Sequence, residues 1–76
     1  MNKQQLKGEI HKLVSELELT IKTLEQQSES EFRQFKETQD KKHFKKHMAI
    51  DKGVSEIKLV VQSLTNAYNW ATRIGE

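Results

Sequence analysis

The densest group of chemically active side chains lies between residues 41 and 52, where lysines and histidines surround one phenylalanine. A basic segment that contains an aromatic residue can follow the phosphates of a nucleic acid. The net charge of the chain is only +2, so we interpret the lysines mainly as a solvated or cross-paired helix face. Contact with a nucleic acid or with an anionic protein surface is the alternative for this basic patch, which comprises Lys41, Lys42, Lys45, Lys46 and Lys52.

The same segment contains the spacing of a possible metal site. His43, His47 and Asp51 follow one another at intervals of four residues, which places them on one side of a helix. Two such histidines can chelate a divalent cation, and a carboxylate can add a further ligand. The lysines among them repel a cation, however. We therefore predict that His47 borders a helix seam and that His43 faces water, and we keep the metal site as the alternative.

The residues expected of an enzyme are missing from the sequence. There is no cysteine, no glycine-rich phosphate loop after a strand and no serine in a nucleophile elbow. The carboxylates alternate with lysines in the manner of solubilising pairs on helix surfaces. We expect neither catalysis nor a cofactor.

Aromatic side chains near the end of the chain indicate a different kind of site. Tyr68 continues an apolar helical stripe, whereas Trp70 lies on a flank among short polar neighbours. Tryptophan and tyrosine are enriched among the residues that dominate protein interfaces. We predict that a partner or a second copy contacts a patch formed by Leu59, Tyr68, Trp70 and Ile74. The alternative is that Trp70 packs beside Ile10 within the same chain.

The elements that must carry these residues follow from the hydrophobic spacing. In each half of the chain, apolar residues recur at alternating steps of four and three, which indicates two long helices with coiled-coil character. Val14 and Ile21 widen the first stripe on one side, and Gly8 and Gly53 interrupt the two arms as points of close approach or as tolerated defects. The stripes are Leu6, Ile10, Leu13, Leu17, Thr20 and Leu24, and then Ile50, Val54, Ile57, Val61, Leu64, Tyr68 and Ala71.

Two polar clusters, residues 25–31 and 37–40, could hold the turn between the helices. If the chain folds back near residue 39, facing residues have numbers that sum to roughly 78 or 79, and Phe35 then meets Phe44. Nearly every apolar residue finds an apolar partner in this register. We therefore predict a helix over about 3–37, a turn over about 38–41 capped by Thr38 or Asp40, and a helix over about 41–74.

The fold class predicted for residues 1–76 is all-α, as one domain formed by a long antiparallel two-helix hairpin. The chain has 76 residues, of which 34% are hydrophobic and 32% are charged. So small a core is marginal on its own. Each arm also carries a second apolar stripe that one seam cannot cover. We therefore expect two hairpins to dimerise into a four-helix bundle.

A lysine- and glutamate-rich helical hairpin without proline or cysteine resembles two kinds of small bacterial protein in layout. One kind is the co-chaperones of type III secretion needle subunits, and the other is the hairpins of type VII secretion substrates. The second kind carries a Trp-x-Gly motif at the turn, which residues 37–40 lack. The first resemblance implies a secretion-type co-chaperone. Neither resemblance transfers a functional residue to this chain.

The function that we expect is a non-catalytic protein–protein interaction module, such as a small adaptor, chaperone or regulatory subunit. It self-associates, most simply as a homodimer, or it binds a helix of another protein. The alternative is a nucleic-acid-associated regulator that uses the basic patch. Because the sequence has no apolar run of about 18 residues and no apolar segment behind its start, we expect no membrane contact, no secretory signal and a cytoplasmic location.

Overall fold

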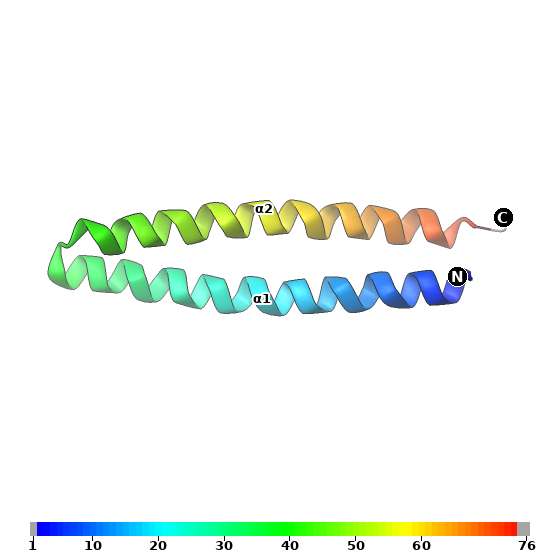
Figure 1. The fold of residues 1–76 in the computed structure, drawn as a ribbon, viewed down its shortest axis with the longest axis horizontal. Coiled ribbons are helices and arrows are strands. Elements are labelled where there is room, and N and C mark those ends of the chain that lie inside the picture. Colours follow the sequence, from blue (N-terminus) through cyan, green and yellow to red (C-terminus); the bar gives the residue numbers. More distant parts are fainter. Residues whose placement is uncertain (1, 75–76) are drawn as a thin grey trace.

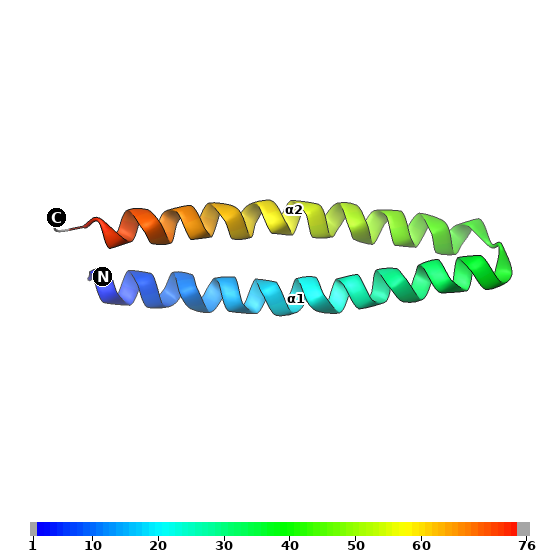
Figure 2. The same cartoon turned by 180° about the vertical axis from the view of Figure 1, so that it is seen from behind.

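The computed structural model describes residues 2–74, which form two helices, α1 (Lys3–Thr38) and α2 (Lys41–Thr72). The helices lie side by side and run in opposite directions, so the beginning of α1 lies beside the end of α2 (Figure 1 and, from behind, Figure 2). The Cα atoms extend over 58 × 14 × 13 Å. The prediction of an all-α antiparallel hairpin is confirmed.

Each helix begins at a side chain that satisfies its free backbone N–H groups. Asn2 accepts a hydrogen bond from the Gln5 amide at 2.9 Å, and the Gln5 side chain accepts one from the Asn2 amide at 3.1 Å. This reciprocal pair is a capping box. At the start of α2, the carboxylate of Asp40 accepts from the Lys42 amide at 3.0 Å. Asp40 is therefore the residue that caps α2, one of the two that the sequence indicated.

The turn consists of only two residues, Gln39 and Asp40. Gln39 has a left-handed backbone conformation with φ 59° and ψ 18°, and its amide donates to the Phe35 carbonyl at 2.7 Å. This geometry ends α1 in the way that glycine usually does. Helix α2 ends at Thr72, two residues before the expected position, since the amides of Arg73 and Ile74 donate to carbonyls only three residues back.

The hydrophobic core is a single seam between the helices. Along α2 it follows the predicted stripe, with Val54 and Ala71 buried. Along α1, the prediction that Leu13 and Thr20 lie on the seam is wrong, because both are exposed. The seam of α1 instead follows buried or half-buried residues that alternate in steps of three and four: Lys7, Ile10, Val14, Leu17, Ile21, Leu24, Ser28, Glu31 and Phe35. Four further residues of α1 are half-buried beside it: Lys3, Leu6, Ser30 and Phe32.

The two flanks of α1 differ in apolar content, and the more apolar flank enters the seam. Starting from Leu13, every seventh residue is polar: Thr20, Gln27 and Gln34. Continuing from Val14 leads through Ile21 and Ser28 to Phe35, which can pack on the aromatic residues of α2. The second series buries more apolar surface, and burial of apolar surface is the main stabilising contribution.

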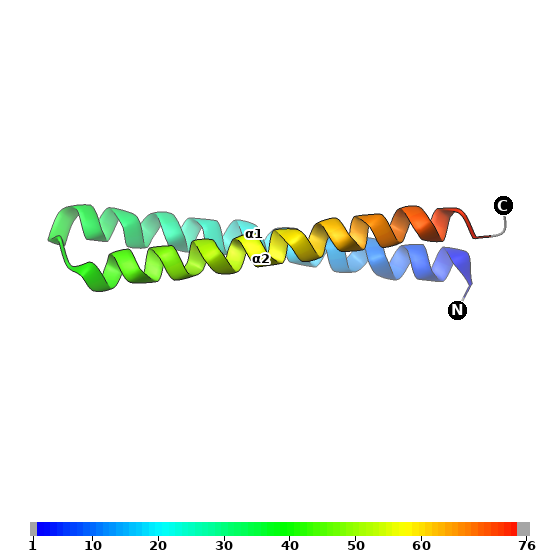
Figure 3. The same cartoon turned by 90° about the horizontal axis from the view of Figure 1, so that it is seen from above.

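Ring contacts near the turn confirm the predicted register. The ring centroids of Phe35 and Phe44 lie 5.2 Å apart, and those of Phe32 and His47 lie 4.8 Å apart. Both pairs have numbers that sum to 79. The helices cross in Figure 3 because they wind around each other, as a seam that repeats every 3.5 residues requires. Within residues 2–74, neither helix holds a stretch apolar enough to span a bilayer.

Candidate functional site

A polar cluster interrupts the apolar seam near the turn. Ser28 of α1 is only 3% exposed. Its Oγ lies 2.7 Å from Nδ1 of His47 and donates a hydrogen bond to Oδ1 of Asp51, both on α2. The Nε2 atom of His47 lies 3.5 Å from Oδ2 of the same Asp51. The hydroxyl of Ser28 therefore links two polar side chains of the opposite helix.

The protons of this cluster can be assigned from its hydrogen bonds. Ser28 donates its hydroxyl proton to Asp51, so its oxygen must accept the bond that joins it to His47. Nδ1 of His47 consequently carries a proton, and it also points to the Ser28 carbonyl at 3.2 Å. No buried side-chain nitrogen or oxygen within residues 2–74 lacks a partner. The seam therefore contains this polar group without an unsatisfied hydrogen bond.

His43 does not face water, contrary to the sequence-based prediction. Its Nδ1 lies 2.7 Å from Oε2 of Glu31 on α1, and the side chains of His43 and Glu31 are 14% and 20% exposed. His43 is thus directed to Glu31, whereas His47 is directed to Ser28 and Asp51. Among residues 2–74, no group of three or more potential ligands is arranged to hold a metal ion, so the geometry does not unite His43, His47 and Asp51 as a metal site.

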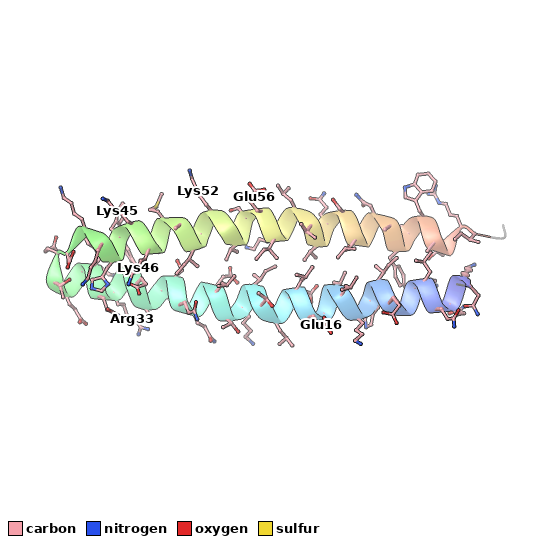
Figure 4. The ribbon with its side chains drawn as sticks, viewed as in Figure 1. Glu16, Arg33, Lys45, Lys46, Lys52 and Glu56 are labelled. Atoms are coloured by element: carbon pink, nitrogen blue, oxygen red, sulfur yellow. The ribbon has the colours of Figure 1, made fainter. Side chains whose placement is uncertain are left out.

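The five lysines of the basic patch are all exposed. Lys42 lies 3.8 Å from the carboxylate of Asp40, and the other four form no ion pair within residues 2–74. Of the two forms of the structural interpretation, a solvated face and a cross-paired face, the geometry agrees with the solvated one. The lysine that reaches the opposite helix is Lys58, 3.4 Å from Glu25. Lys45 and Lys52 lie along the outer edge of α2 in Figure 4.

The four residues proposed as a partner interface occupy different sides of α2. Tyr68 is half-buried in the seam, where Nζ of Lys7 lies 5.1 Å from its ring centroid. Trp70 does not pack within the hairpin: it is 67% exposed, and the Arg73 guanidinium lies over its ring, at 4.8 Å. Leu59 and Ile74 are also exposed, at 59% and 52%.

The two broad faces of the hairpin differ in charge. Glu25 and Lys58 each follow a seam residue and pair on one face, beside His11 and Glu18 of α1 and Asp51 of α2. Seam positions are spaced alternately three and four residues apart. The residue just before each three-residue step lies on the other face, because the two flanks of a heptad seam are on opposite sides of each helix. We call the surface formed by these residues the uncharged face: Leu6, Leu13, Thr20, Gln27 and Gln34 of α1, Gly53, Val60 and Ala67 of α2, and Ile74 just after α2.

The uncharged face contains large apolar side chains that the hairpin does not cover. Leu13, Val60 and Ile74 are 46%, 50% and 52% exposed. Trp70 borders this face, since it lies three residues after Ala67 and four before Ile74. The only charged residue in the same heptad positions is Lys46, at the turn end. The uncharged face therefore resembles a protein interface in composition.

Sequence reasoning missed Ser28, Glu31 and Leu13 as members of these sites. A signal was present for Leu13, because the stripe through Val14 leads to Phe35 and leaves Leu13 outside the seam. No comparable signal marked Ser28 or Glu31. Their partners on α2 are 12 to 23 residues away in the sequence, and such pairings depend on the register of the folded hairpin.

Comparisons of the whole chain with protein-family models, with curated proteins and with solved structures found no match.

Proposed function

We propose that this chain is a non-catalytic protein–protein interaction module, a small adaptor, chaperone or regulatory subunit that docks helices on its uncharged face. The supporting observation is the imbalance between buried and exposed apolar side chains. In residues 2–74, four hydrophobic residues are buried, whereas eight large ones are exposed. A hairpin with so thin a core gains stability from any helix that covers its apolar surface.

The composition of the uncharged face suits a helix. Leu13 and Val60 are exposed and supply aliphatic contact, and the small residues Gly53 and Ala67 allow a close approach of backbones. Docking of an amphipathic helix on such a surface needs few polar contacts.

A matched pair of photo-crosslinking variants tests this function. The photoreactive residue benzoylphenylalanine replaces Leu13 on the uncharged face or Leu19 on the outer side of α1, and each variant is irradiated in cells of the source organism. Leu13 is 46% exposed and Leu19 is 68% exposed, so accessibility alone favours Leu19. We expect specific adducts from position 13 and few from position 19. Mass spectrometry of the adducts identifies the partner.

The outcome at position 13 decides the proposal. Discrete adducts that depend on this position support docking on the uncharged face, whether the partner is another protein or a second copy. Adduct yields that are equal at the two positions, or absent at both, contradict it.

A second candidate function is nucleic-acid association through the basic patch. The observation that favours it is that Lys41, Lys45, Lys46 and Lys52 are exposed and form no ion pair within the described residues. Phosphate contacts release counterions, so the affinity would fall steeply with salt, whereas apolar helix docking would change little.

Oligonucleotide binding at several salt concentrations separates the two functions. If the patch binds phosphates, Lys45→Gln with Lys52→Gln should weaken binding. The slope of log affinity against log salt should also become shallower by about 0.9 for each phosphate that is no longer neutralised. Lys3→Gln with Lys12→Gln, at the opposite end of the hairpin, removes the same charge as a control. Binding that is absent, or equally weakened by both pairs, contradicts this function.

A further inference from the structure

We infer that the occupant of the uncharged face is a second copy of this chain, docked face to face with both turns at the same end. The inference rests on the proposed interaction function and names its partner. Three properties of the face carry it: its area, the distribution of its apolar residues and the charges at its edges.

The broad side of the hairpin is large enough for a stable dimer. Its Cα atoms span an outline of 58 by 14 Å, and each partner of a standard protein interface contributes roughly 800 Å² of accessible surface, which is of the order of this outline. A single docked helix would cover only part of this width. A second hairpin covers both helices at once and completes a four-helix bundle.

The apolar residues of the face determine how the second copy is oriented. Leu6, Leu13, Ala67 and Ile74 all lie in the half of the hairpin away from the turn. The half near the turn carries Gln27, Gln34, Gly53 and Lys46 instead. If the second copy were reversed end to end, leucine and isoleucine would meet glutamine and lysine. With both turns at the same end, the apolar halves cover each other.

This orientation corresponds to a two-fold axis parallel to the helices. Such an axis places α1 of one copy against α2 of the other, antiparallel and in the register already present within each hairpin. Leu13 then faces Ala67 of the second copy, and Thr20 faces Val60 of the second copy. Large and small residues alternate across the interface, which allows side chains to interdigitate.

The charges at the edges of the face agree with the same arrangement. If the numbers of facing residues sum to 79, as they do within the hairpin near its turn, Glu37 lies opposite Lys42 of the second copy. These two side chains carry opposite charges. Glu16 and Glu56 lie at the outer edges of α1 and α2 in Figure 4, and they face Ser63 and Thr23 of the second copy. No like charges are therefore opposed at these positions, as complementary surfaces require.

Distances between spin labels test the orientation directly. Because the chain contains no cysteine, Lys41→Cys near the turn and Asn69→Cys near the open end each introduce a single nitroxide, measured by double electron–electron resonance. The same-end dimer predicts distances well below the 58 Å length of the hairpin for both labels. A dimer reversed along its whole length predicts long distances for both. A reversed dimer that overlaps only at the open ends predicts a short distance for residue 69 and a long one for residue 41.

Substitutions on the face provide an independent measurement. In sedimentation equilibrium, we expect a dimer of the parent chain and a dissociation constant raised by more than about tenfold for Leu13→Glu. Leu19→Glu introduces the same charge in the same helix but on its outer side, so its dissociation constant should equal that of the parent. Circular dichroism at matched concentrations reports whether each variant remains helical. The spin-label distances use an unaltered face and decide the orientation even where Leu13→Glu unfolds.

The possible results separate this inference from the proposed function. Short distances for both labels, together with selective dissociation by Leu13→Glu, support it. A reversed dimer, a dimer that Leu19→Glu disrupts equally, or a monomer at millimolar concentration overturns it. If the chain is monomeric and position 13 still crosslinks to another protein, the inference fails but the proposed function stands. If the chain is monomeric and position 13 forms no adduct, both fail.

Discussion

Ser28 is the residue at which the hairpin departs most from an apolar coiled coil. Its hydroxyl is buried and joins His47 and Asp51 of the opposite helix. A polar residue at a core position is known in coiled coils to specify register at some cost in stability. Here Ser28 meets these partners in the register in which Phe35 meets Phe44. The polar cluster and the aromatic contacts thus favour the same alignment of the two helices.

Replacement of Ser28 should reveal the contribution of these hydrogen bonds. Ser28→Ala removes the buried hydroxyl, but it also improves helix propensity by about 0.5 kcal/mol. Ser15→Ala on the exposed side of α1 improves helix propensity by the same amount and therefore serves as the control. The free energy of unfolding, measured in urea, should be lower for Ser28→Ala than for Ser15→Ala by about 1 kcal/mol, the typical net value of a hydrogen bond. Equal values for the two variants would show that the cluster does not stabilise the hairpin.

Trp70 reports the state of the surface beside the uncharged face. It is the only tryptophan of the chain and is 67% exposed. At concentrations where the protein is monomeric, we expect acrylamide to quench its fluorescence efficiently. Because Trp70 borders the proposed interface, quenching should decrease as dimers form. A strongly protected indole in the monomer would contradict the exposed position and restore the interpretation that Trp70 packs within its own chain.

At the scale of the elements, the two-residue turn is the most constrained part of the backbone. Gln39 adopts a left-handed conformation that a side chain disfavours. Its Nε2 donates to the Lys36 carbonyl at 3.0 Å, which offsets part of this cost. The Asp40 cap then starts α2 immediately. The turn therefore depends on local hydrogen bonds rather than on glycine or proline.

Two substitutions at Gln39 separate the backbone strain from the side-chain bond. Gln39→Ala and Gln39→Gly both lose the hydrogen bond to Lys36, but glycine adopts the left-handed conformation without steric cost. Gln39→Gly should therefore be more stable than Gln39→Ala by about 1 kcal/mol in thermal or urea unfolding. Equal stability would indicate that the turn changes conformation when the side chain is shortened.

The glycines inside the helices do not serve close approach within the hairpin. A Cβ atom added at Gly8 or Gly53 would meet no other atom within 4 Å. Gly8→Ala should therefore stabilise the protein by about 1 kcal/mol, the difference in helix propensity between the two residues. Gly8 lies outside the uncharged face, so the dissociation constant of the dimer should not change. An unchanged or lower free energy of unfolding for Gly8→Ala would contradict the helical context described for this residue.

At the scale of the whole molecule, stability and association should be coupled. A hairpin with four buried hydrophobic residues between positions 2 and 74 has little core of its own, and covering the uncharged face adds apolar burial to the folded state alone. The urea midpoint should consequently rise with protein concentration. At a protein concentration a hundred times the dissociation constant, association raises the free energy of unfolding by about 2.7 kcal/mol. A midpoint independent of concentration would mean that the hairpin is stable without association.

The spacing of apolar residues along the chain is sufficient to specify the two helices, the turn and the register. Alternating steps of four and three apolar residues leave no regular structure other than a helical seam, and the absence of proline lets each helix run for more than 30 residues. The same spacing predicts that Phe35 faces Phe44 once the chain folds back near residue 39. In a two-helix hairpin, the position of the turn determines all long-range contacts, so one correct assignment specifies the whole topology.

In contrast, the choice of the flank of α1 that faces α2, and of the polar side chains that meet, depends on how the two helices pack. The stripes through Leu13 and Val14 share the same three residues, Ile10, Leu17 and Leu24, so their local periodicity is almost equal. The two stripes become distinguishable at Ser28, Glu31 and Phe35, because the contribution of these residues to stability depends on their contacts with α2. Pairings such as Glu31 with His43 depend on side-chain positions across the seam, where small rotations of a helix exchange one neighbour for another. The exposed uncharged face is the direct consequence, since turning Val14 inward left Leu13 outside.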